Sequence, residues 1–94
     1  MTKVILNVDK KRKSVYFDCM NHAGDSLVCA MASTLCGIVL LSCERAKLMP
    51  DRYESGHMTV NIPNAADWML NMFDIVGDVF EQIAEQYPQF IKIY

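Results

Sequence analysis

The chain has few residues that break or staple a fold. Its 94 residues include 4 glycines, 3 prolines and 4 cysteines, and no two cysteines have CxxC spacing. This excludes a low-complexity linker and argues for free thiols rather than a disulfide scaffold. Cys29, Cys36 and Cys43 recur every seven residues, so on a helix neighbouring thiols are separated by about 10 Å of rise. That is too wide for one tetrahedral zinc, and we expect neither a metal nor another cofactor.

An excess of positive charge is also absent. Lys and Arg number 9 against 11 Asp and Glu, which gives a net charge of −2 and no general attraction for phosphate backbones. We therefore do not expect a nucleic-acid partner. The basic run 10–13 is the exception, and RNA contact is one interpretation of it. We favour a solvated hairpin tip with edge-protecting charges.

The sequence shows no signal peptide and no membrane-length apolar run. Its first residues, MTKVILNVDKKRK, reach a basic run after a short apolar stretch, and the longest apolar run is GIVLLSC. A bilayer requires about 20 apolar residues. We expect a cytoplasmic protein without a membrane partner. The length and the hydrophobic content of 52% predict one domain, 1–94, with its own core.

The hydrophobic pattern predicts the order β-β-α-β-α-β. Alternation indicates strands, and 3,4 spacing indicates helices. The strands are expected at 4–8, 14–20, 57–62 and 89–94, and the helices at 27–45 and from about 63 to 87. The segment 47–56 is expected to be a polar connector. Two helices on one face of a small, largely antiparallel sheet make an α+β fold.

The two predicted helices differ in their apolar surfaces. The first is apolar almost all round, which predicts a central, buried helix. The second is amphipathic, but it carries more apolar surface than a small sheet can cover, including Trp68, Met69, Met72, Phe73 and Phe80. Such a patch commonly marks an interface, and we expect a homodimer.

One cysteine falls where a helix would favour its thiolate. If Asp25 or Ser26 caps the first helix, Cys29 lies in the first turn, near unpaired N–H groups and the positive end of the helix dipole. His22 precedes it by a loop that can fold back. The pair would be a nucleophile beside its base, with amides available for an oxyanion. Such a pair also arises by chance, so a core-filling thiol remains the alternative.

The stretch HAGDSLVCAMAS resembles the signature of the ribosomal-processing cysteine protease family. The residues that match in order are His22, Ala23, Asp25, Cys29, Ala30 and Ser33. The closing FEQIAEQYPQFIKIY is similar to the helix–proline–strand that ends family members. The family consists of bacterial proteases that remove an N-terminal extension from a large-subunit ribosomal protein, number twenty-seven. Their small α+β domain dimerises.

The resemblance implies a catalytic dyad of Cys29 as nucleophile and His22 as base. It also implies a cysteine endopeptidase whose partner is a ribosomal protein precursor. Asp25 and Ser33 are candidate supporting residues. Asp25 could orient His22, although helix capping is the simpler role. Ser33 lies one turn after Cys29 and could act near the site, or bond back into its own helix.

The sequence departs from the family pattern before and between the dyad residues. Asn21 stands where relatives have glycine, and asparagine is the best substitute for glycine in a left-handed backbone. The loop from His22 to Cys29 is short. Both features favour the alternative, a non-catalytic dimeric module that binds a peptide or precursor. A thiol redox protein is a weaker third class, because Cys29 has no resolving cysteine within a few residues.

Overall fold

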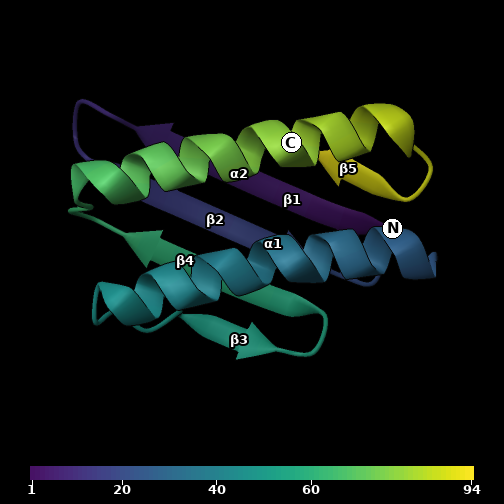
Figure 1. Cartoon of the computed structure of the whole chain (residues 1–94), viewed down its shortest axis with the longest axis horizontal. Coiled ribbons are helices and arrows are strands. Elements are labelled where there is room, and N and C mark those ends of the chain that lie inside the picture. The colour runs from purple at the N-terminus through teal and green to yellow at the C-terminus, as the bar shows by residue number, and fades with distance from the viewer.

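In the computed structural model, which describes residues 1–94, five strands form one sheet and two long helices lie across one of its faces (Figure 1). The strand order is β3-β4-β2-β1-β5, antiparallel throughout except for the parallel pair β1 and β5. This confirms the predicted α+β fold. The elements are β1 (Thr2–Asp9), β2 (Ser14–Met20), α1 (Ser26–Arg45), β3 (Arg52–Glu54), β4 (His57–Ile62), α2 (Asp67–Gln86) and β5 (Ile91–Ile93).

The predicted order lacked one strand. β3 lies inside the segment that was expected to be a connector, so the observed order is β-β-α-β-β-α-β. It pairs with β4, with Arg52 opposite Thr59 and Glu54 opposite His57. All three residues of β3 are exposed, so the strand has no alternation of buried and exposed positions. A period-two pattern could not reveal it.

The core lies between the helices and the sheet. Phe17 of β2 points toward α2, where its ring centroid is 6.0 Å from those of both Phe73 and Phe80. All three side chains are fully buried. Tilted aromatic pairs at this distance add to the stabilisation from area burial. The chain is closed by β5 beside β1, where the Thr2 N–H donates to the Phe90 carbonyl at 2.9 Å.

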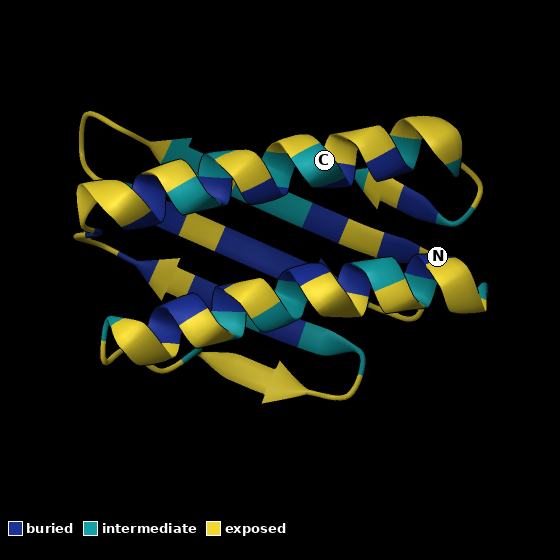
Figure 2. Cartoon of the chain, in the orientation of Figure 1, coloured by how far each residue is buried: buried dark blue, intermediate teal, exposed yellow.

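α1 is not the buried central helix that its composition predicts. One stripe faces the sheet, but Leu27, Ile38 and Leu41 are exposed, Leu41 by 60%. Figure 2 shows that the outward surfaces of both helices are largely exposed. In a two-layer fold nothing covers the outer side of a helix, so an all-round apolar sequence leaves apolar surface in the solvent. α1 is also long and apolar enough to cross a bilayer by length and composition alone, a test that core helices of soluble proteins pass.

The basic run is the β1–β2 turn, as predicted. Lys10 Nζ lies 2.7 Å from Asp74 Oδ2, and Lys13 Nζ lies 3.5 Å from Asp67 Oδ1. Two lysines of the basic run therefore pair with carboxylates of α2. Exposed pairs of this kind contribute little to stability. They do neutralise charge that an RNA contact would need.

Candidate active site

The loop between β2 and α1 is held from both sides at its first residue. Asn21 has φ 72°, in the left-handed region that asparagine tolerates best after glycine. Its N–H donates to the Gly56 carbonyl at 2.7 Å, and its carbonyl accepts from the Thr2 hydroxyl at 2.9 Å. The position therefore has the backbone conformation that glycine or asparagine would supply. His22 follows directly.

Asp25, rather than Ser26, caps α1. Its Oδ1 accepts from the N–H groups of Leu27 and Val28 at 3.0 and 3.1 Å, and its carbonyl accepts from the Cys29 N–H at 2.9 Å. No hydrogen bond joins this carboxylate to His22. The three first-turn amides therefore already have partners, which leaves them poorly placed for the oxyanion role that the sequence suggested.

The sulfur of Cys29 accepts a hydrogen bond from a backbone amide. The Ala23 N–H lies 3.3 Å from Sγ, so the loop folds back over the start of α1. Ala23 is buried, with 3% of its surface exposed, whereas Cys29 is half-buried. The sulfur therefore has a main-chain donor and remains accessible.

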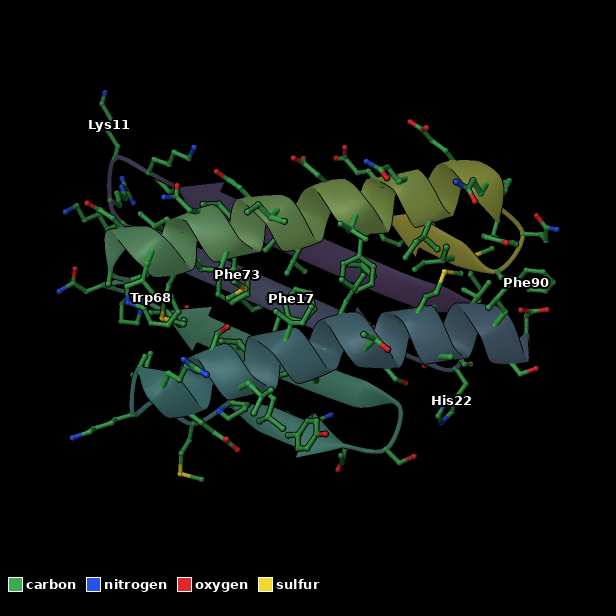
Figure 3. The ribbon with its side chains drawn as sticks, in the orientation of Figure 1. Lys11, Phe17, His22, Trp68, Phe73 and Phe90 are labelled. Atoms are coloured by element: carbon green, nitrogen blue, oxygen red, sulfur yellow. The ribbon has the colours of Figure 1, made fainter.

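His22 and Cys29 line the same cavity, of about 330 Å³, between the first half of α1 and the β3–β4 turn. Figure 3 shows His22 beside the first turns of α1. No hydrogen bond joins the imidazole to Sγ. In ligand-free sites, catalytic hydrogen bonds are often long and shorten only in the substrate complex.

Ser33 is exposed and also lines this cavity. The back-bonding role considered for Ser33 belongs to its neighbour, because Thr34 Oγ1 donates to the Ala30 carbonyl at 2.8 Å. The hydroxyl of Ser33 is free to meet a ligand.

Two thiols at the edge of the core, Cys19 and Cys36, also line the cavity. The side chains of Cys19 and Cys36 interact there. This contact, aided by burial, raises the pKa of Cys19 far above its usual range. The same contact lowers the pKa of Cys36, against the opposing effect of burial. The inward position of Cys19 on β2 was visible in the sequence, but its partner on α1 was not.

The sequence also did not predict a network of polar side chains on the face of the sheet that the helices leave uncovered. His57 is half-buried, and its Nε2 lies 2.8 Å from Asp18 Oδ1. Thr59 donates to the same oxygen at 3.1 Å, and Arg52 donates to His57 Nδ1 at 3.1 Å. With Nδ1 accepting, the neutral ring donates through Nε2. These residues join β2, β3 and β4, and only the strand register brings them together.

The comparisons with known proteins agree with this architecture. No protein-family model matches the chain, and no curated protein matches it. A solved structure does: the crystal structure of an essential ribosomal processing protease, Prp, from S. aureus, in complex with a covalently linked product peptide. The match has a TM-score of 0.77 and 23% sequence identity, and it covers 99% of this chain and 97% of that one. At this identity the likeness shows the fold.

Proposed function

We propose that this protein is a cysteine endopeptidase that removes the N-terminal extension of a large-subunit ribosomal protein, number twenty-seven, in the cytoplasm. The proposal rests on Cys29, which lies in the first turn of α1. Its sulfur accepts a hydrogen bond from the Ala23 N–H, and its side chain lines the same cavity as His22. The shared fold with a ribosomal processing protease supports it. No cofactor is required.

In this mechanism His22 takes the proton of Cys29, and the thiolate attacks the scissile carbonyl. The tetrahedral intermediate collapses to a thioester when His22 returns the proton to the leaving amine. Water, deprotonated by His22, then attacks the thioester and restores the thiol. Because Asp25 occupies the first-turn amides, we assign the oxyanion to the Ala23 N–H, which donates to Sγ in the free protein and can turn to the oxyanion once Sγ has bonded to the carbonyl carbon.

Recognition of the substrate is assigned to β3. This strand lies at the edge of the sheet, so one side of its backbone is unpaired, and Tyr53 and Glu54 line the cavity. An extended peptide can add to such an edge through main-chain hydrogen bonds. Strand addition here would deliver a peptide to the cavity that holds Cys29.

We also propose that two copies of the chain associate through the outer surfaces of α1 and α2. A second, largely apolar hollow of about 360 Å³ lies between the helices. Its lining includes the exposed side chains of Ile38, Trp68 and Ile75, and Leu41 is exposed on the same helix as Ile38. A contiguous apolar surface of this kind commonly marks an interface, and a twofold homodimer is the simplest way to cover it.

The direct test is to incubate the purified protein with the ribosomal protein precursor of its own genome and to identify products by mass spectrometry. One cut within the N-terminal extension is expected. An intact precursor that nevertheless binds would favour the non-catalytic binding module.

A further inference from the structure

The turn between β3 and β4 presents a bare α-carbon to the candidate base. Ser55 and Gly56 form this turn, and Gly56 has φ +77°, where glycine carries no steric cost. A Cβ at Gly56 would lie 3.0 Å from Nε2 of His22, 3.3 Å from its Cδ2 and 3.6 Å from its Cε1. The imidazole therefore occupies the space that a side chain at position 56 would need.

The His22 side chain is exposed, and Gly56 limits its ring on one side. In many Cys–His and Ser–His sites a third group orients the base through a hydrogen bond. The nitrogens of His22 have no hydrogen-bond partner, and the nearby carboxylate of Asp25 bonds to helix amides instead. The contact with Gly56 takes the place of that third group.

The same turn is bonded to the residue before His22. The Asn21 N–H donates to the Gly56 carbonyl at 2.7 Å. The turn therefore contacts His22 in two ways. It bonds to the backbone just before His22, and Gly56 lies beside the imidazole ring. A shift of the turn would move both.

The polar network on the uncovered face of the sheet holds the turn in place. His57 follows Gly56, and its Nε2 bonds to Asp18, a β2 residue that is only 7% exposed. Thr59, further along β4, bonds to the same carboxylate. Asp18 therefore fixes the first half of β4 to β2, and Gly56 with it.

We propose that Gly56 is a positioning residue for His22, and that the β3–β4 turn sets the distance between the imidazole and the sulfur of Cys29. The inference rests on the proposed function, because it takes His22 as the base. A side chain at position 56 would displace the ring. A Cβ at 3.0 Å requires the ring to move by a few tenths of an ångström, less than the misplacement of about 1 Å that can cost on the order of 10²-fold in rate. We therefore expect kcat to fall about tenfold while KM changes little.

The test uses Gly56→Ala and Gly56→Asn. Both place a Cβ against His22, but asparagine tolerates the left-handed backbone, so Gly56→Asn keeps the turn intact if strain unfolds Gly56→Ala. Gly37→Ala is the matched control, because its Cβ would meet nothing within 4 Å. Circular dichroism checks folding, and the rate of Cys29 alkylation by iodoacetamide at neutral pH is measured alongside kcat and KM.

Each variant is also made in a His22→Ala background, which separates positioning of the base from a general structural effect. We expect Gly56→Asn to slow Cys29 alkylation about tenfold when His22 is present and to have no effect when it is absent, in line with the contribution of a positioned base. Equal slowing in both backgrounds, or no slowing in a folded Gly56→Asn, overturns the inference. If His22→Ala alone leaves the alkylation rate unchanged, the proposed dyad itself fails.

Discussion

The Ala23 N–H donates to Sγ of Cys29 across 3.3 Å, which joins the residue after His22 to the first turn of α1. The short loop between His22 and Cys29 is therefore closed over the sulfur by its own backbone.

Cys29 should react first among the four thiols with limiting iodoacetamide near pH 7, as read by peptide mapping. It alone combines a helix N-terminus, a backbone donor and a nearby histidine. Cys36 is the nearest competitor, because its contact with Cys19 lowers its pKa. Equal labelling of all four, or labelling of Cys36 before Cys29, would count against the dyad.

Cys29→Ala should abolish cleavage of the precursor but still bind it, because peptide binding does not need the sulfur. His22→Ala should reduce kcat by about 10²-fold or more, since the leaving amine then lacks a proton donor. Cleavage followed by mass spectrometry, with binding followed by fluorescence anisotropy, separates an enzyme from a binding module. Undiminished cleavage by Cys29→Ala would contradict the assignment of Cys29 as nucleophile and of His22 as its base.

Asp25→Ala should lower the free energy of unfolding by about 1 kcal/mol, because two first-turn amides lose their cap. It should also slow Cys29 alkylation, since the start of α1 frays beside the sulfur. Urea denaturation measures the first effect. Asp25→Ser is the control, because serine also caps helices, and it should recover most of both losses.

Sedimentation at micromolar concentration should show a particle of about twice 10.7 kDa. Ile75→Asp, on the exposed side of α2, should yield a folded monomer, because Ile75 is 63% exposed and its replacement disturbs no core contact. A monomeric wild type, or a dimer unaffected by Ile75→Asp, would contradict the proposed interface.

The free energy of unfolding should decline as the pH rises above about 9. Burial, and then the charge of Asp51, raise the pKa of the Cys43 thiol in the folded chain. Above the unfolded pKa of about 8.5 the unfolded chain loses this proton while the folded chain keeps it, so folding becomes less favourable. Urea denaturation from pH 7 to 10 measures the decline. Cys43→Ala should make the decline shallower without removing it, because the raised pKa of Cys19 acts in the same direction. This variant also starts from a lower stability.

The long periodic elements could be predicted from the sequence, and residues that depend on register could not. β2 and β4 were predicted with their observed bounds, because a buried apolar residue stands at every second position of each strand. β3 was missed because all of it is exposed. Asp18 and His57 are far apart in the chain, and only the pairing of β2 with β4 makes them neighbours.

In the candidate site, too, the residues set by a local pattern could be predicted, and those set by a tertiary contact could not. A cap followed by a first-turn cysteine is a local pattern, so Asp25 and Cys29 could be placed in advance. The contact of Gly56 with His22 depends on where a distant turn lies in space, which no spacing encodes. The all-round apolar pattern of α1 misled the prediction of burial, because periodicity alone cannot show whether a second layer covers the outer side of a helix.

The pairing of β5 with β1 also has a consequence for when the site can form during synthesis. The Phe90 carbonyl holds the Thr2 N–H, and the Thr2 hydroxyl holds the carbonyl of Asn21, the residue before His22. A chain of two hydrogen-bonded contacts thus links the last strand to the base. Because β5 is made after the other strands and helices, a nascent chain lacks this support until β5 has joined the sheet. The proposed proteolytic activity should therefore not reach its full level before β5 pairs with β1.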